Sequence, residues 1–226
     1  MRKLSIIIPV LNEEPFFSKQ QNYLKSFSKL GHEIIVVDGG STDGSIATAK
    51  KLGCKCLITK ASRGFQLHAG ANASSNDILV FLHADTILPQ TAIDDIETSF
   101  KNTNASWGRF KVAFDNEKLI FKIIAWFMNN RSCITGIATG DHTLFIKRGT
   151  YFDSGGFSDI SIMEDIELCK RLKKYSNPLC LMRSVITSSR KWEKHGIIKT
   201  ILLMWRLRLR YFLGTSADKL AKEYYS

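Results

Sequence analysis

The sequence predicts an α/β fold with a mostly parallel central sheet flanked by helices and a basic amphipathic helix near its C-terminal end. Three observations lead to this prediction. Short apolar runs, typical of buried strands, alternate with segments of helical periodicity. Acidic residues follow the ends of several of these runs, and 226 residues with 44% hydrophobic content suffice to build a domain core.

The expected strands and helices alternate along the chain in the pattern of βαβ units. The first half is expected to hold strands at residues 4–10, 33–37, 54–58 and 78–82 and helices at residues 16–30, 45–52, 63–73 and 91–100. Further strands are expected at residues 106–114, 143–146, 179–182 and 185–187, and a helix at residues 163–174. This order predicts parallel strands whose carboxyl ends meet at one edge of the sheet.

A glycine-containing turn with two aspartates directly follows the strand at residues 33–37. Gly39 allows close approach of the backbone to a ligand, and Ser41 or Asp43 can cap the next helix. In open α/β sheets, ligands bind outside the carboxyl ends of the strands. Asp38 and its turn are therefore a candidate ligand site, with a simple turn and helix cap as the alternative.

A second acidic residue, Asp85, follows the strand at residues 78–82 and so reaches the same edge of the sheet. A carboxylate among diphosphate oxygens would be repelled unless a divalent cation lay between them, and Mg²⁺ and Mn²⁺ favour oxygen ligands. Asp85 is therefore the first candidate for a metal ligand, with a helix cap as its alternative. Further candidates for a metal ligand are His142 and His195, each of which has a structural histidine as its alternative.

A third acidic pair, Glu164 and Asp165, begins the helix expected at residues 163–174. The helix dipole favours acids in a first turn, so the pair alone indicates no site. Arg63, between an expected strand and helix, suits a diphosphate or a sugar, with a solvated surface arginine as the alternative. Residues 155–157 are expected to form a flexible loop that bounds a pocket, which would be the acceptor pocket if the protein transfers a group to a second substrate.

Taken in order, these motifs resemble the family 2 glycosyltransferases, whose GT-A fold is Rossmann-like. The motifs are residues 4–14, the Asp38 turn, residues 83–85, 155–157 and 164–165, and the resemblance covers roughly residues 4–175. The stretch 188–196 and the basic helix after it resemble a bacterial subgroup whose acceptors are largely undefined. We expect a GT-A-like domain at residues 1–195 and a basic helical appendage at residues 196–226.

The resemblance implies a nucleotide-sugar site at the ends of the first strands. Pro9, Asn12 and Glu13 resemble the floor of the nucleotide pocket, and Asp38 resembles the residue that hydrogen-bonds the base. The full set expected to bind the nucleotide sugar is Pro9, Asn12, Glu13, Asp38, Gly39, Ser41, Asp43, Arg63, His83 and Asp85.

The resemblance also implies the residues of the reaction. Asp85 resembles the metal-binding aspartate of a D-x-D motif, although His83 occupies the place of the first aspartate. At that place His83 is a candidate for contact with ribose or with the metal, and the alternative is that it lies outside the site. Asp165 resembles the catalytic base of inverting members, with Glu164 beside it. Either Trp107 or Trp192 is a candidate face for stacking on a sugar.

Glycosyl transfer needs an acceptor hydroxyl that loses its proton during attack and a leaving diphosphate whose growing charge is neutralised. In this chemistry Asp165 takes the proton, and a cation at Asp85, Mg²⁺ or Mn²⁺, neutralises the diphosphate. We therefore expect an inverting transferase that uses a nucleotide-diphosphate sugar, with UDP-sugar favoured, and an unidentified acceptor hydroxyl.

Two other functions are compatible with a nucleotide-binding α/β core. A nucleotidyltransferase usually has a basic, Gly-rich phosphate loop after the first strand, whereas residues 11–14 are acidic, which disfavours this alternative. The second alternative is a non-catalytic nucleotide-binding or membrane-adaptor protein, which would have the nucleotide pocket but would catalyse no reaction.

The chain carries a net charge of +11, and residues 183–226 hold 10 basic against 3 acidic residues. The segment 196–213 has basic and apolar faces, although Arg208 interrupts the apolar one. This pattern suits a helix lying on an anionic membrane, and equally a helix packed on the core or on a second copy in a homo-oligomer. Nucleic acid is a weaker alternative, because no known fold motif accompanies the cations.

No segment reaches the roughly 18 consecutive apolar residues of a membrane-spanning helix, and the basic N-terminus leads into the first strand. The 5 cysteines include no C-x-x-C pair, so reduced structural thiols are expected. These features predict a cytoplasmic protein, with peripheral contact at the inner face of the plasma membrane and a lipid-linked acceptor as further expectations.

Overall fold

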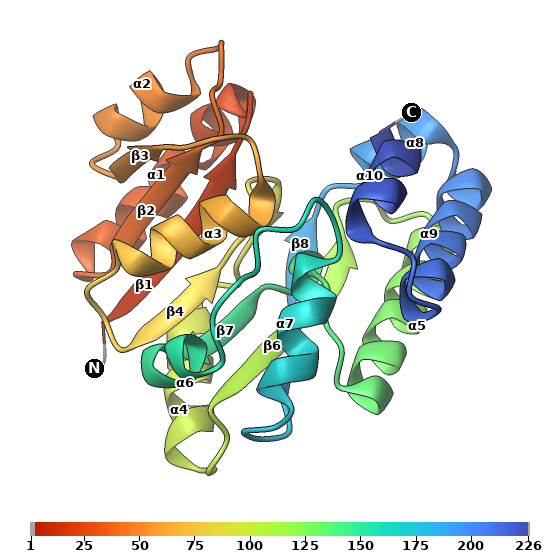
Figure 1. Ribbon diagram of the computed structural model, residues 1–226. Helices are drawn as coiled ribbons and strands as arrows, with labels where there is room; N and C mark the ends of the chain where they lie inside the picture. Colours follow the sequence, from red (N-terminus) through yellow and green to blue (C-terminus); the bar gives the residue numbers. More distant parts are fainter. Residues whose placement is uncertain (1–2, 226) are drawn as a thin grey trace.

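The computed structural model describes residues 3–225 as helices layered on both faces of one sheet (Figure 1). The strands are β1 Leu4–Val10, β2 Glu33–Asp38, β3 Lys55–Ile58, β4 Ile78–Phe81, β5 Thr86–Ile87, β6 Trp107–Phe114, β7 Leu144–Lys147 and β8 Leu179–Thr187. The helices are α1 Glu14–Lys29, α2 Ser45–Lys51, α3 Arg63–Asn72, α4 Ala92–Lys101, α5 Leu119–Thr135, α6 Arg148–Asp153, α7 Glu164–Leu172, α8 Arg190–His195, α9 Ile197–Phe212 and α10 Ala217–Tyr225, with a 3₁₀ turn η1 at Gly140–His142.

The first half of the chain forms the parallel part of the sheet. β1 pairs in parallel with β2 and β4, and β2 pairs in parallel with β3. β1 is buried on both faces, because Ile6 and Ile8 pack with α1, α2 and α4, whereas Ile7 packs with α3 and α7. This double burial explains the continuous apolar run and places the carboxyl ends of β1, β2 and β4 at one edge, as the sequence predicts.

The second half of the sheet is mixed, in the order β3-β2-β1-β4-β7-β6-β8-β5. β7 is antiparallel to β4 and β6, while β8 is parallel to β6 and antiparallel to β5. The two separate strands expected at residues 179–182 and 185–187 are wrong, because β8 is continuous. A bulge accounts for the difference: Arg109 pairs with Cys180 but Lys111 pairs with Ser184, so the strand passes through polar residues that interrupt its apolar pattern.

The sequence analysis missed α5, whose apolar residues cover much of its circumference. Phe121 is 1% exposed and Trp126 is 61% exposed, so the helix lacks the one-sided pattern by which surface helices are identified. Asn129 fixes α5 to β6, because its Oδ1 accepts a hydrogen bond from Val112 N–H (2.9 Å) and its Nδ2 donates to Val112 O (2.9 Å).

The C-terminal helices pack against the rest of the protein through one face. Leu207 of α9 and Leu220 of α10 belong to the hydrophobic cluster that contains α3 and α7, and Glu223 forms ion pairs with Arg206 and Arg210. Core packing, one of the alternatives for residues 196–213, therefore holds for this face. Apolar side chains also lie exposed on α9, among them Ile198, Leu202, Trp205, Leu209 and Leu213.

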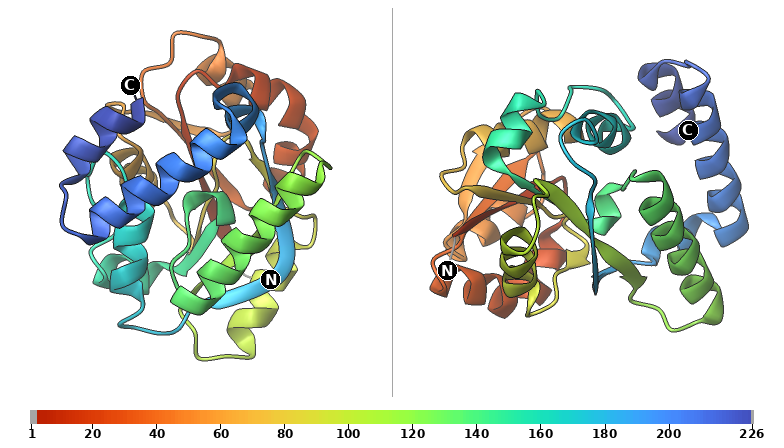
Figure 2. Two further views of the ribbon diagram at one scale, coloured as in Figure 1. Left: turned by 90° about the vertical axis from the view of Figure 1, so that its right-hand side faces the viewer. Right: turned by 90° about the horizontal axis from the view of Figure 1, so that it is seen from below.

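α5 and α9 lie side by side, on the side of the molecule away from β1–β3 (Figure 2). Within residues 3–225, no helix combines the length and the apolar character needed to cross a membrane. The division of the chain at residue 196 falls between α8 and α9 and stays a prediction.

Candidate active site

The carboxyl ends of β1, β2 and β4 and the loops that follow them form one edge of the sheet, which we call the strand rim. It carries Asn12, Asp38 (the last residue of β2) and Asp85. Asp38 is 2% exposed, and its Oδ2 accepts hydrogen bonds from the N–H groups of Gly40 (3.0 Å) and Ser41 (2.9 Å). The Ser41 hydroxyl donates to the other oxygen. Asp38 therefore shapes the turn, and its expected contact with a base stays a prediction.

The loops after β1 and β2 are tied together by side chains that bond to the opposite backbone. Asn12 N–H donates to Ser41 Oγ (2.8 Å), and Asn12 Oδ1 accepts from Thr42 N–H (2.9 Å). Glu14 N–H donates to Asp43 Oδ2 (3.1 Å). Because these donors and acceptors satisfy one another, the strand rim has a defined shape without a ligand.

Gln66 of α3 is a buried polar residue of this site that sequence reasoning missed. Its Nε2 donates to Val10 O (3.0 Å) and Val37 O (2.8 Å), at the ends of β1 and β2. A Cβ atom at Gly39 would lie 3.2 Å from this nitrogen, so the expected close backbone approach at Gly39 is made to α3. The one signal in the sequence is a glutamine on an otherwise apolar helix face.

Glu13 links the strand rim to α8. Its Oε2 lies 3.6 Å from Arg190 Nη2, and its N–H donates to Ser45 Oγ (2.9 Å). Burial raises the pKa of Glu13, the charge of Arg190 lowers it, and the charge of Asp85 raises it. Three charged groups from distant segments thus lie within electrostatic range of one another. Arg190 was not among the predicted site residues, although it lies in the stretch 188–196 that resembles the bacterial subgroup.

His83 faces Asp141 of the η1 turn, with 3.5 Å between His83 Nδ1 and Asp141 Oδ1. A Cβ atom at Gly140 would lie 2.0 Å from His83 Nε2, so only glycine allows this approach. Burial raises the pKa of Asp141, but the hydrogen bond and charge of His83 outweigh burial and hold that pKa below its usual range. Asp141 was not among the predicted site residues, and it lies far from Asp85 along the chain.

Asp85 fits a divalent cation that is shared between the protein and a diphosphate. Within residues 3–225, no three His, Cys, Asp or Glu side chains form a metal-binding group. Mg²⁺ is usually held by one or two carboxylates together with substrate phosphates, and Asp85 supplies such a ligand. His142 is fully buried against Thr139, and His195 is exposed at the end of α8; both placements suit structural histidines.

The two acidic residues at the start of α7, Glu164 and Asp165, have different partners. Asp165 Oδ2 accepts a hydrogen bond from Gly140 N–H (2.8 Å), and its Oδ1 accepts from Ile166 N–H (2.7 Å). Glu164 is buried, and Arg63 Nη1 lies 3.6 Å from its Oε1. Burial raises the pKa of Glu164, and the charge of Arg63 opposes this rise. Arg63 therefore faces the acidic pair and not only solvent.

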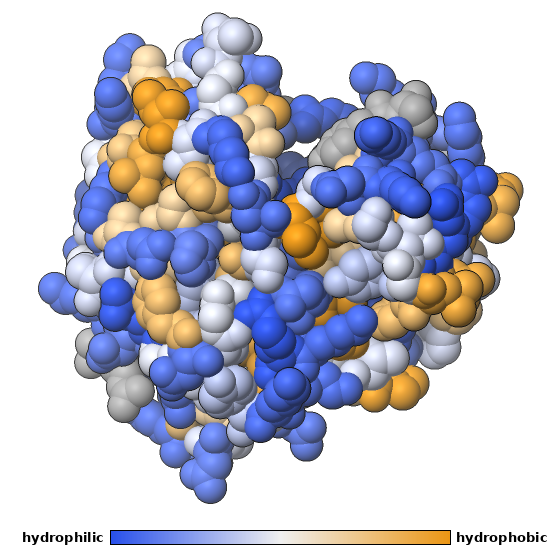
Figure 3. Space-filling model, in the orientation of Figure 1, coloured by the Kyte–Doolittle hydropathy of each residue, from blue (hydrophilic) through white to orange (hydrophobic). Residues whose placement is uncertain are grey.

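Tyr224 of α10 shows that these groups surround one region. Burial raises the pKa of its hydroxyl, the charge of Arg63 lowers it, and the charges of Asp141, Glu164 and Asp85 raise it. These charges come from four segments that are distant in sequence. Figure 3 shows a hollow between the part of the molecule built on β1–β4 and the C-terminal helices. The structure thus brings the second and third acidic clusters together.

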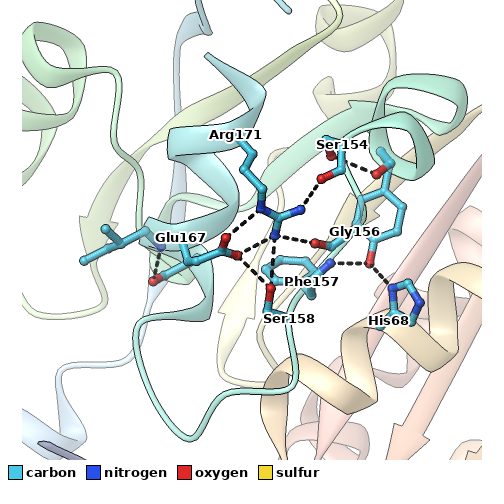
Figure 4. Close-up of polar contacts among 10 residues, drawn as sticks. His68, Ser154, Gly156, Phe157, Ser158, Glu167 and Arg171 are labelled. Atoms are coloured by element: carbon cyan, nitrogen blue, oxygen red, sulfur yellow. Dashed lines mark hydrogen bonds and ion pairs between the residues drawn. The ribbon is translucent and has the colours of Figure 1, made fainter. Parts of the chain in front are cut away.

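The loop at residues 154–158, expected to be flexible, is held by Arg171 of α7 (Figure 4). The guanidinium donates to the Ser154 carbonyl and to Gly156 O (2.6 Å), and its Nε donates to Glu167 Oε1 (2.7 Å). On the other side of the loop, Phe157 N–H donates to the hydroxyl of Tyr151 (3.0 Å). These contacts fasten the loop between α7 and α6.

The two tryptophans proposed as sugar-stacking faces have different surroundings. Trp107 is 0% exposed, and its Nε1 donates to Ser176 O (2.9 Å). The expectation for Trp107 is therefore wrong, because its ring is part of the core. Trp192 packs edge-on against Phe114, with 5.7 Å between ring centroids.

Known proteins resemble this chain in sequence and in fold. A family model described as glycosyl transferase family 2 matches residues 5–158. An uncharacterized glycosyltransferase of Rickettsia typhi is 35% identical over 106 residues, which are 46% of this chain and 35% of that protein. The match thus spans about a third of the length of this relative.

Two solved structures share the architecture at low sequence identity. Staphylococcus aureus TarS in complex with UDP-GlcNAc has a TM-score of 0.64 and 15% identity, over 82% of this chain and 58% of that one. A mannosyltransferase of Pyrobaculum calidifontis, in complex with GDP-Man and Mn²⁺, has a TM-score of 0.62 and 16% identity, over 92% of this chain and 60% of that one. The GT-A fold predicted from the sequence is confirmed.

Proposed function

The chain belongs to glycosyl transferase family 2, and from that premise we propose that it moves a sugar from a nucleotide-diphosphate sugar to an acceptor hydroxyl with inversion at the anomeric carbon. The observation that carries the proposal is that the η1 turn joins two acidic clusters: Asp141 lies 3.5 Å from His83, two residues before Asp85, and Gly140 N–H donates to Asp165 (2.8 Å). In this proposal Asp85 serves the cation and the diphosphate, and Asp165 serves the acceptor.

In the proposed reaction, the acceptor oxygen forms a bond to the anomeric carbon while the bond from that carbon to the diphosphate oxygen breaks. The electron pair of the broken bond stays on the diphosphate, and the acceptor proton passes to Asp165. The hydrogen bonds from Gly140 and Ile166 fix the Asp165 carboxylate, and each oxygen retains a lone pair that can accept a proton. Arg63 faces the leaving diphosphate or its sugar.

A divalent cation bound at Asp85 would act as a Lewis acid on the diphosphate oxygens. UDP-GlcNAc and GDP-Man, bound by the two similar structures, differ in base. We favour a UDP-sugar, as the resemblance implies. The nucleotidyltransferase alternative remains disfavoured, because the acidic loop after β1 is occupied with hydrogen bonds to the loop after β2.

The experiment is calorimetric titration of UDP, GDP, CDP and dTDP, each with and without Mn²⁺. The proteins are the wild type, Asp85→Ala and Asp77→Ala, since Asp77 is exposed just before β4, at the other end of the same strand. We expect metal-dependent binding of one diphosphate, lost in Asp85→Ala and kept in Asp77→Ala. Binding of none of the four to the wild type would contradict the proposal.

We also propose a peripheral location at an anionic membrane, with a lipid-linked acceptor and a cytoplasmic protein body. The exposed apolar residues of α9 and α5, with exposed Lys122 on α5, support it. The test is co-sedimentation with phosphatidylglycerol and phosphatidylcholine vesicles, using Leu202→Gln as the variant. Equal sedimentation of the variant and the wild type with anionic vesicles would contradict this location, and dimerisation through the same face would appear as a doubled mass in light scattering.

A further inference from the structure

A pocket of about 450 Å³ lies between α5, the start of α7 and α9, within the usual volume of small-molecule sites. Its lining residues include none from the strand rim. They include Arg131, Ile166, Trp205, Arg208, Leu209 and Phe212, and we call it the arginine pocket. Nothing in the proposed reaction has used these residues.

Two guanidinium groups of the arginine pocket have no carboxylate within ion-pair distance among the described residues. Arg206, which also lines it, pairs with Glu223. By contrast, neither Arg131 nor Arg208 forms an ion pair within the described part of the chain. Arg131 Nη1 donates to Ile137 O (3.4 Å), and its Nη2 is buried with no hydrogen-bond partner. An unpaired buried cation is unfavourable unless something else completes its hydrogen bonds.

Both arginines lie within electrostatic range of Asp165. Burial lowers the pKa of Arg131 to about 10, and the charge of Arg208 adds to this effect while that of Asp165 opposes it. Burial also lowers the pKa of Arg208, again opposed by Asp165. Ile166, the residue after Asp165, lines the pocket. A molecule held in the arginine pocket would thus lie next to the proposed base.

The outer wall of the arginine pocket is apolar and open to the surface. Trp205 is 67% exposed, Leu209 61% and Phe212 55%. These three side chains lie on the same side of the molecule as the exposed apolar residues of α5. Part of this side is visible at the right of Figure 3. A ligand that fits both walls needs an anionic group and an apolar part.

We propose that the arginine pocket binds the acceptor, and that the acceptor is an amphiphile whose anionic group lies against Arg131 and Arg208 while its apolar part lies along Trp205, Leu209 and Phe212. The inference rests on the proposed function, because Asp165 makes the neighbouring molecule an acceptor. Guanidinium groups suit this role, since their planar donors match phosphate and carboxylate oxygens.

The test is calorimetric titration with octyl phosphate below its micelle concentration, compared with inorganic phosphate and with the neutral octyl glucoside. The proteins are the wild type, Arg208→Gln and, as a matched control, Lys199→Gln, which removes an exposed charge from the same helix. We expect octyl phosphate to bind the wild type more tightly than either comparison ligand. Arg208→Gln should bind it about tenfold more weakly, as expected when a charge-assisted hydrogen bond is lost, and Lys199→Gln should bind it as the wild type does.

Each other outcome overturns a stated part of the inference. Equal binding of octyl phosphate by Arg208→Gln and the wild type would exclude Arg208 from the site. Octyl glucoside binding as tightly as octyl phosphate would exclude an anion site. Inorganic phosphate binding as tightly as octyl phosphate would exclude the apolar part. Titration of UDP with Mn²⁺ into the same proteins separates the two proposals. If UDP binds and octyl phosphate does not, only this inference fails. If octyl phosphate binds and UDP does not, the proposed function is contradicted, and the arginine pocket is an amphiphile site without a role as an acceptor site.

Discussion

On the strand rim, Asp38 accepts hydrogen bonds from its own loop and the loops after β1 and β2 bond to each other, whereas in the arginine pocket Arg131 and Arg208 have no carboxylate partner among the described residues. The polar groups of the strand rim bond to one another, whereas the arginine pocket contains cations that form no ion pair among the described residues. A nucleotide would therefore meet a preformed surface, while an acceptor would supply groups that the protein lacks.

The largest expected effect separates the two regions by function. Asp165→Asn should retain binding of the nucleotide diphosphate and lose turnover of the nucleotide sugar by about 10²–10⁴-fold, the usual contribution of a general base. Release of nucleotide diphosphate from candidate UDP-sugars measures turnover, and calorimetry measures binding. Asp94→Asn, an exposed first-turn acid of α4, is the control. Loss of binding in a folded Asp165→Asn protein would contradict its assignment to the acceptor side.

The second prediction tests whether the strand rim depends on its internal hydrogen bonds. Gln66→Leu removes the donor that the carbonyls of Val10 and Val37 share, so the free energy of unfolding should fall by about 1–3 kcal/mol. Urea denaturation measures the change, and Gln21→Leu on the exposed face of α1 is the control. A variant as stable as the wild type would mean that water replaces the amide.

The third prediction concerns the loop held by Arg171, beside α7. Hydrogen bonds from Arg171 and Ser158 outweigh burial and lower the pKa of Glu167. Its charge therefore stabilises the fold fully above the unfolded value of 4.5, and this contribution is lost as pH falls through the lower folded pKa. Glu167→Gln should cost about 1 kcal/mol at pH 7 and progressively less below pH 4.5. A cost independent of pH would show that packing and not charge holds the loop.

The smallest expected effect tests the other side of the comparison. Arg208→Gln removes a cation that has no ion pair, so the free energy of unfolding should stay within about 0.5 kcal/mol of the wild type. Thermal and urea unfolding check this value. A loss comparable to that of Gln66→Leu would mean that Arg208 has a structural role, and the contrast between the two regions would disappear.

The strand rim could be predicted from the sequence because its elements are local. A buried parallel strand produces an uninterrupted apolar run, as in β1, β2 and β4, and the polar residues at its end follow directly in the chain. Asp38 and Asp85 were found in this way. Gln66 was missed because one glutamine in a helix has no pattern of its own.

The arginine pocket and the η1 turn could not be predicted, because they are built from segments that are close only in the fold. Arg131 comes from α5 and Arg208 from α9, and the sequence analysis took Arg208 as a break in an apolar face. Asp141 meets His83 only because β7 lies next to β4. Such pairings depend on strand order, which antiparallel additions to a sheet leave open.

The pairing of β5 with β8 has a consequence for how the protein is made. Thr86, directly after Asp85, pairs with Thr187, and their hydroxyl oxygens lie 3.1 Å apart across a separation of 101 residues. Because a ribosome delivers the chain from its N-terminal end, β1, β2 and β4 can meet well before this partner is synthesised. The loop that carries Asp85 is therefore among the last parts of the site to acquire its shape during translation.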